Sequence, residues 1–187
     1  MQSMTAPLAR PRPARWTRAD YAAMAEAGVL AGRRVQLLDG EIVELPPMLN
    51  PHVRGLRVAR DLLLPRLPAG GVLEQQVPLS RGLAAPWIGG ASDPEPDAAV
   101  YLGEADAPPL WALEISDTTL GVDRGRKLRI YARAGVPAYW VLDLNGRALY
   151  AYAEPAGDDY GALLTHRGGA IALPWAADPI SLADLLP

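Results

Sequence analysis

The stretch 96-PDAAVYLGEADAPPLWALEIS-116 contains two apolar runs joined by a Gly- and Pro-rich turn, and each run carries an acidic residue. This pattern predicts two antiparallel strands. If Leu102 pairs with Pro109 or its neighbours, the numbers of paired residues add up to about 211, which places Asp97 opposite Glu114. Opposed side chains on one face have Cβ atoms about 5 Å apart, so the two carboxylates lie close enough to share a divalent cation.

The two acids need compensation for their charge. Glu114 lies inside an apolar run, where a charged residue is costly unless it is paired, hydrogen-bonded or bound to a metal. For one buried acid, a structural ion pair with an arginine is the commoner explanation. Two opposed acids repel each other, so without a cation one of them would tend to hold a proton. A metal ion or a lysine is therefore the natural partner of this pair.

Lys127 is the only lysine of the chain, and the other basic residues are arginines. One lysine has to fall somewhere by chance, but its compact ammonium suits a place beside a water or a phosphate better than the planar guanidinium does. Asp123, Lys127 and Tyr131 recur at helical spacing within a helix expected over residues 122–134. This helix follows the strand that carries Glu114, so the sequence predicts that Lys127 meets the acidic pair.

The remaining segments alternate between helix and strand patterns. Asp39-Gly40 and Asn145-Gly146 each separate two apolar runs, which predicts two β-hairpins. Further helices are expected over residues 17–28 with Thr17 as N-cap, from Asn50 as N-cap to about Pro68, and over 182–187 with Ser181 as N-cap, and further strands over 71–80 and within 161–174. The sequence thus predicts one α/β (α+β) domain over residues 16–187, after a proline-rich leader over residues 1–15.

Composition excludes several classes of protein. The chain has no cysteine, so disulfides, thiolate metal sites and cysteine nucleophiles are not available. No apolar run is long enough to span a bilayer, and we expect a soluble, cytoplasmic protein without a membrane partner. The net charge of −3 argues against coating of nucleic acid by bulk attraction. Basic residues nevertheless gather over 52–66 and 121–133, and acids over 93–106, which predicts a basic face beside an acidic centre.

An ordered series of motifs resembles the Uma2-like family, which is grouped with the PD-(D/E)xK restriction-endonuclease-like nucleases. The motifs are LLDGEIVEL (37–45), NPHVRG (50–55), EPDAAVY (95–101), LEISDTT (113–119) and DRGRKLRIYARAGVPAYWVLD (123–143). The resemblance extends from about Leu37 to Tyr152. It implies a restriction-endonuclease-like core in which helices flank a mixed central β-sheet, with the N-terminal helix and hairpin added to it.

The resemblance also implies roles for individual residues. Asp97 and Glu114 match the acids that bind Mg²⁺ or Mn²⁺, together with the main-chain carbonyl near Ile115. In the usual nuclease motif a lysine follows the second acid by two residues, but this chain has Ser116 there, and Lys127 matches a lysine that has moved to the next helix. Further positions expected to border the site are Glu44, His52, Asp123 and Tyr131.

The chemistry implied is metal-dependent hydrolysis of phosphodiester bonds, with DNA as the expected substrate. Arginines on the two predicted helices, Arg54, Arg57, Arg124 and Arg126, are expected to contact the nucleic-acid backbone. A homodimer is expected because restriction enzymes often dimerise to cut both strands. Two alternatives remain at this point: a nuclease-fold module that has lost activity and only binds nucleic acid or dimerises, and a glycosidase that uses the acid pair.

Overall fold

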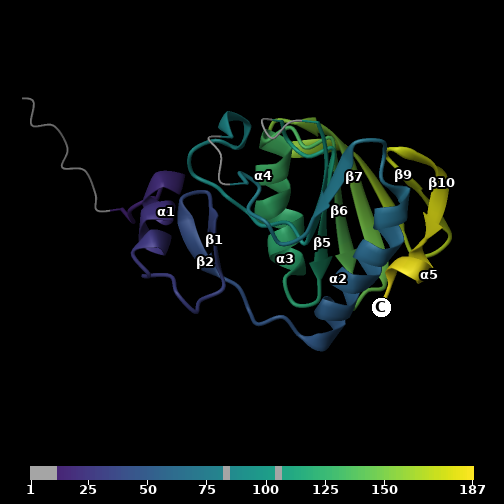
Figure 1. The fold of residues 1–187 in the computed structure, drawn as a ribbon, viewed down its shortest axis with the longest axis horizontal. Helices are drawn as coiled ribbons and strands as arrows, with labels where there is room; N and C mark the ends of the chain where they lie inside the picture. Colours follow the sequence, from purple (N-terminus) through teal and green to yellow (C-terminus); the bar gives the residue numbers. More distant parts are fainter. Residues whose placement is uncertain (1–11, 82–84, 104–106) are drawn as a thin grey trace, which may run out of the picture.

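A six-stranded mixed sheet forms the centre of the protein in the computed structural model (Figure 1). The described residues are 12–81, 85–103 and 107–187, so residues 1–11 of the predicted leader lie outside them. The strands lie in the order β3 (Gly71–Glu74), β4 (Ala98–Leu102), β5 (Trp111–Ser116), β6 (Ala138–Asp143), β7 (Ala148–Ala156) and β8 (Asp159–His166). β5 and β6 pair in parallel and the other neighbours pair antiparallel. The predicted mixed sheet flanked by helices is confirmed.

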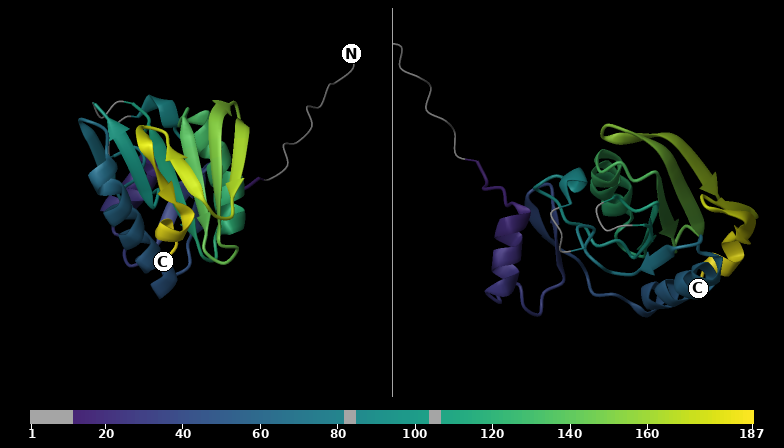
Figure 2. Two further views of the ribbon diagram at one scale, coloured as in Figure 1. Left: turned by 90° about the vertical axis from the view of Figure 1, so that its right-hand side faces the viewer. Right: turned by 45° about the horizontal axis from the view of Figure 1, so that its top comes forward.

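Different elements cover the two faces of the sheet (Figure 2). One face packs against α2 (Asn50–Leu63), α5 (Leu182–Leu185) and the hairpin of β9 (Ala170–Leu173) and β10 (Ala176–Ser181). The other face packs against α4 (Leu128–Arg133). Trp111 lies at the centre of the first core and meets Trp140 and Trp175 edge-on, with ring centroids 5.3 Å and 5.4 Å apart. These three tryptophans therefore pack the core beneath α2.

The alternation of side chains along β5 decides where Glu114 points. Trp111, Leu113 and Ile115 enter the core under α2, whereas Ala112 enters the core under α4. Because successive side chains of a strand point to opposite faces, Glu114 shares the α4 side. The apolar run thus buries an acid beneath the helix that follows it in the chain.

The predicted register of the carboxylate hairpin is confirmed. Ala98 pairs with Leu113 and Ala99 with Ala112, so the numbers of each pair add up to the predicted sum. Asp97 directly precedes β4, at the end of the ladder where this register leads to Glu114. Helix α2 approaches β5 closely, because a Cβ atom on Gly55 would lie only 3.0 Å from Ile115 Cγ2. This close packing brings the first turn of α2 to the end of the hairpin.

An N-terminal unit lies beside the main sheet (Figure 1). It consists of α1 (Arg18–Glu26), whose N-cap Thr17 forms a capping box with Asp20, and the predicted hairpin of β1 (Val35–Leu38) and β2 (Glu41–Glu44). The hairpin is a sheet of its own and is attached to the core by main-chain contacts. Leu37 bridges to Asp93, and the Gly40 N–H donates to the carbonyl of Ala91 at 2.6 Å.

Several element boundaries differ from the sequence prediction. Leu49, with extended backbone, is the N-cap of α2, and Asn50 is its first residue, so Asn50 provides no side-chain cap. The helix continues as a 3₁₀ turn over Leu64–Arg66. β3 is shorter than expected because Gln76 has a left-handed backbone with φ 53°, which interrupts the strand. Strand β10 was not predicted, since its sequence AADPIS lacks a clear alternating pattern.

The helix expected over residues 122–134 consists of three segments. These are α3 (Leu120–Val122), a π-helical turn (Asp123–Lys127) and α4. The Leu128 N–H reaches back to the carbonyl of Asp123, five residues earlier, which defines the wider turn. Asp123 and Lys127 both face the sheet from this turn. Among the described residues, none of the helices combines the length and the apolar character that crossing a bilayer requires.

Candidate active site

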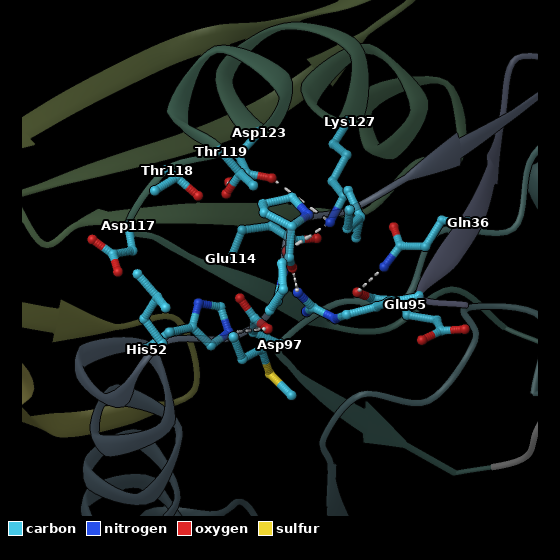
Figure 3. A pocket seen from close by; sticks show the side chains of 16 residues that line it. Gln36, His52, Glu95, Asp97, Glu114, Asp117, Thr118, Thr119, Asp123 and Lys127 are labelled. Carbon is cyan, nitrogen blue, oxygen red and sulfur yellow. Dashed lines mark hydrogen bonds and ion pairs between the residues drawn. The ribbon is translucent and has the colours of Figure 1, made fainter. Parts of the chain in front are cut away.

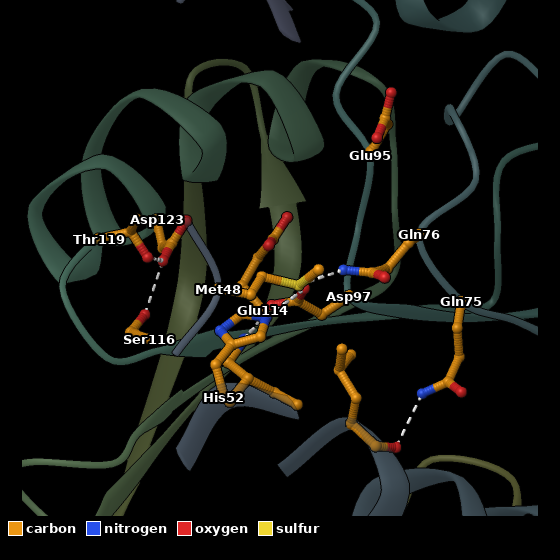
Figure 4. A network of polar contacts seen from close by, with 12 residues as sticks. Met48, His52, Gln75, Gln76, Glu95, Asp97, Glu114, Ser116, Thr119 and Asp123 are labelled. Atoms are coloured by element: carbon orange, nitrogen blue, oxygen red, sulfur yellow. Dashed lines mark hydrogen bonds and ion pairs between the residues drawn. The ribbon is translucent and has the colours of Figure 1, made fainter. Parts of the chain in front are cut away.

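Asp97 is held by two donors at the end of the carboxylate hairpin. His52 Nε2 lies 3.0 Å from Asp97 Oδ1, and the main-chain N–H of Ile115 donates to Asp97 Oδ2 at 2.7 Å. Asp97 and His52 are 4% and 8% exposed. The histidine therefore contacts the site acid directly, rather than lying on the surface as a first-turn histidine usually does (Figure 4).

Lys127 reaches the second acid from the helix above (Figure 3). Its Nζ lies 2.9 Å from Glu114 Oε2 and 3.6 Å from Asp123 Oδ1. The hydroxyl of Tyr131 donates to Glu114 Oε1 at 2.6 Å. All of these side chains are buried. Of the predicted acidic pair, Lys127 thus contacts Glu114, and its second ion-pair partner is Asp123 and not Asp97.

A second set of donors fixes Asp123. Its Oδ2 accepts hydrogen bonds from Ser116 Oγ at 2.7 Å and from Thr119 Oγ1 at 2.6 Å. The hydroxyl of Tyr139 donates to the Asp123 carbonyl at 2.8 Å, which holds the π-helical turn against the sheet. Ser116, which stands where the usual motif has lysine, thus orients the carboxylate that helps to hold Lys127.

The site carries more negative than positive charge. The pKa of Glu114 is raised to about 8, mainly by burial, with Lys127 and the hydrogen bond from Tyr131 opposing the rise and repulsion by Asp123 and Asp97 adding to it. Burial disfavours the ammonium of Lys127, but attraction by Glu114, Asp123 and Asp97 outweighs this cost and raises its pKa. The two shifts differ in origin, since burial is the main cause at Glu114, whereas at Lys127 the combined attraction of the acids overcomes burial. A cation bound here would relieve the surplus of negative charge.

These groups line a cavity of about 30 Å³. Water occupies a similar share of volume in the liquid, so the cavity holds small species and not a nucleotide. Several lining residues were not predicted from the sequence, namely Gln36, Glu95, Asp117, Thr118 and Thr119. Glu95 lies two residues before Asp97, and this alternate spacing could have revealed it. Gln36 gives no such signal, because the docking of the N-terminal hairpin brings it here.

Some predicted residues lie elsewhere. Glu44 does not border the cavity: its carboxylate is exposed and pairs with Arg33 at 2.8 Å, because it ends a strand on the solvent side of the hairpin. Arg124 Nε donates to the hydroxyl of Tyr152 and its guanidinium stacks on Tyr150.

Arg126 also has a protein partner, since it pairs with Glu41 at 2.7 Å. In contrast, Arg54 and Arg57 are exposed on α2, and no ion pair joins them to the described residues. Only these two of the four predicted arginines have unengaged guanidinium groups.

Comparison with known proteins identifies the family of this chain. A family model, Uma2, described as "Putative restriction endonuclease", matches residues 18–177. The chain belongs to the Uma2 family. The fold resembles a crystal structure described as "a putative nuclease belonging to DUF820" from Anabaena variabilis, with a TM-score of 0.60 and 16% sequence identity over 81% of this chain and 89% of that chain. No curated protein is significantly similar in sequence. Membership of the Uma2 family supports a nuclease-like function.

The donor set of this Uma2 protein fits Mg²⁺ or Mn²⁺. Each carboxylate oxygen of Asp97 and Glu114 accepts one hydrogen bond and keeps a lone pair for a cation. Within the described ranges, no group of three or more His, Cys, Asp or Glu residues is arranged to hold a metal ion. Mg²⁺ needs only one or two carboxylates, because waters and substrate phosphates complete its shell.

Proposed function

We propose that this protein is a metal-dependent endonuclease that hydrolyses phosphodiester bonds of nucleic acid, with DNA as its expected substrate. One observation carries the proposal: a buried ammonium, that of Lys127, lies 2.9 Å from one of two opposed carboxylates. Enzymes that hydrolyse phosphodiester bonds with the help of a metal ion use such a pair of acids together with a lysine. Membership of the Uma2 family supports this class of reaction.

Each residue of the site has a separate role in the proposed hydrolysis. Asp97, Glu114 and the carbonyl of Ile115 would hold Mg²⁺ or Mn²⁺, which supplies Lewis-acid polarisation of the phosphate and lowers the pKa of a bound water. Lys127 orients the attacking water and stabilises negative charge that develops on the phosphate. His52 fixes the orientation of Asp97. A hydrogen bond that fixes a ligand in this way commonly affects metal affinity as much as a ligand does.

Tyr131 fixes Glu114 in the same manner, and Asp123 keeps Lys127 charged and in place. We also expect Arg54 and Arg57, which line a groove on α2 with Asn50 and Val53, to contact phosphates of the substrate. We further propose that residues 16–187 act as one domain and that the protein works in the cytoplasm, where its substrate is found.

The direct test is cleavage of plasmid and single-stranded DNA. We expect the wild type to cut in Mg²⁺ or Mn²⁺ and to lose this activity in EDTA. The double variant Asp97→Asn/Glu114→Gln should be inactive, because neutral amides do not replace two anionic ligands, while its circular dichroism spectrum remains that of the wild type. Binding of DNA by the wild type without cleavage in either metal would favour the inactive binding module instead.

We also propose that the protein forms a homodimer through the edge strand β8. Leu163 and Leu164 of this strand are 46% and 66% exposed, and Leu164 borders an apolar groove of about 600 Å³. Asp159 begins the strand and His166 ends it, so antiparallel pairing of two copies brings acidic and basic ends together. An unpaired apolar edge is otherwise prone to aggregation.

Light scattering after gel filtration tests the dimer. The wild type is expected to elute as a dimer and Leu163→Lys/Leu164→Lys as a folded monomer, since two charges would be buried in the interface. Val29→Lys is the matched control, because Val29 is 61% exposed and far from β8 in the sequence. A wild type that is monomeric at about 50 μM, within the range of ordinary homodimer affinities, would contradict the proposal.

A further inference from the structure

A second, larger groove opens beside the site cavity. Its volume is about 530 Å³, and Arg34, Gln36, Met48 and Glu95 line both spaces. The groove lies between the N-terminal unit and the chain around Gln76, and nothing in the proposed hydrolysis uses it. Small-molecule sites range from about 300 to 1,000 Å³, so a mononucleotide-sized group fits, whereas a duplex does not enter.

One buried polar atom in this groove lacks a partner. Gln36 is 3% exposed, and its Nε2 donates to the Glu95 carbonyl at 3.3 Å (Figure 3). Its Oε1 accepts no hydrogen bond from any described residue. A buried amide carbonyl that lacks a donor is unfavourable, so this atom favours a ligand that brings an N–H or O–H group. The Glu95 carboxylate lines the same groove and is a second acceptor.

The rest of the groove suits a nucleobase. Tyr21, whose hydroxyl is tied to the Val35 carbonyl at 2.8 Å, and Met48 offer a ring and a thioether for stacking. Gln76 donates to Met48 Sδ at 2.9 Å from a left-handed backbone with φ 53° (Figure 4). Such a conformation is costly for a residue other than glycine and is often found at functional sites.

The positively charged side chain of Arg34 lines both the groove and the site cavity. Arg34 Nη1 donates to the Pro46 carbonyl at 2.8 Å, and no ion pair joins Arg34 to a described carboxylate. Its other donors are therefore available to a phosphate between the groove and the acid pair. Two acceptors in the groove, together with an arginine that also lines the site cavity, match a base with an exocyclic amine, followed by its phosphate.

We propose that this groove binds an unpaired nucleotide next to the scissile phosphate, and that it prefers a base with an exocyclic amine. The substrate is then a single strand or a locally unpaired segment. This inference rests on the proposed function, because that function identifies the neighbouring cavity as the site of cleavage. The inference itself concerns only the binding of the nucleotide. Unpaired bases are commonly recognised in this way, by stacking and by hydrogen bonds to their Watson–Crick edges.

The experiment is fluorescence anisotropy of the full-length chain in EDTA, where cleavage does not contribute. Labelled dC15, dT15, C15 RNA and a dC15·dG15 duplex are compared. Cytosine presents an amine where thymine presents a carbonyl, so dC15 is expected to bind about tenfold more tightly than dT15, as a good pair of hydrogen bonds allows. The single strand is expected to bind more tightly than the duplex. The RNA arm shows whether ribose is accepted and does not alter the preference for cytosine over thymine.

Variants connect the preference to the groove. Gln36→Leu removes the free acceptor and is expected to abolish the difference between dC15 and dT15. Glu95→Gln, at a half-buried position, should reduce the difference and provides a second readout if Gln36→Leu does not fold. Arg129→Ala is the control, because Arg129 is exposed and points away from the face of Lys127. The inference would be overturned by equal binding of dC15 and dT15 or by tighter binding of the duplex. It would also be overturned if both variants kept the preference for dC15 over dT15. Each of these results would count against it even if the protein cuts DNA.

Discussion

Replacing Lys127 by methionine is expected to reduce the rate of DNA cleavage by about 10²- to 10³-fold, the usual cost of removing one group that stabilises transition-state charge. Methionine keeps much of the length and volume of the side chain and removes the ammonium that lies 2.9 Å from Glu114. The measurement is the initial rate of plasmid nicking in Mg²⁺ at a fixed enzyme concentration. Cleavage by Lys127→Met at the wild-type rate would exclude Lys127 from catalysis.

The loss of activity must be separated from a loss of stability. Removing one partner of a buried ion pair can cost about 3–5 kcal/mol, and both side chains of this pair are almost fully buried. The double variant Lys127→Met/Glu114→Gln removes both charges and should recover much of that stability without recovering activity. Urea denaturation of the two variants distinguishes a destabilised enzyme from one that lacks a catalytic group.

Lys127→Arg provides a more specific comparison. Arginine keeps the positive charge, but its planar guanidinium is larger and does not fit easily into the buried space of a compact ammonium. Because Glu114 and Asp123 are the two carboxylates that contact this ammonium, we expect Lys127→Arg to disturb both contacts and to be nearly as inactive as Lys127→Met. This result would explain why the chain keeps a lysine here while its other basic residues are arginines.

Much of the site could be predicted because short-range patterns determine it. The register that opposes Asp97 and Glu114 follows from one turn and from the alternation of two apolar runs, and the structure has that register. Lys127 follows on the next helix, so its approach to Glu114 depends on one crossover between neighbouring strands. Local rules are most reliable over such distances.

The errors concern contacts that no local pattern encodes. Gln36 reaches the cavity because the N-terminal hairpin docks through main-chain bonds, such as that from Gly40 to Ala91, to a loop distant in sequence. The π-helical turn needs one extra residue per turn, which helical periodicity does not reveal. Glu44 matched a family position, yet it belongs to a strand whose side chains face solvent at that end.

Metal binding is expected to depend strongly on pH because the pKa of Glu114 is raised to about 8. Below this value the carboxyl group holds a proton that a cation must displace. Between pH 8 and pH 6 the affinity for Mn²⁺ should therefore fall by about 50-fold, close to the tenfold per pH unit that applies when one proton competes with the metal. The sign follows from the raised pKa, since an acid with an ordinary pKa would already be ionised at pH 6 and would show little change.

Isothermal titration calorimetry checks this expectation directly. Titrations of Mn²⁺ at pH 7 in buffers of different ionisation enthalpy should reveal close to one proton released per ion bound, because the cation replaces the proton on Glu114. Glu114→Gln has no carboxyl group at this position, so its weaker binding should vary little between pH 6 and pH 8. An affinity of the wild type that is constant over this range would show that Glu114 is already ionised, and that Lys127 alone neutralises it before the metal arrives.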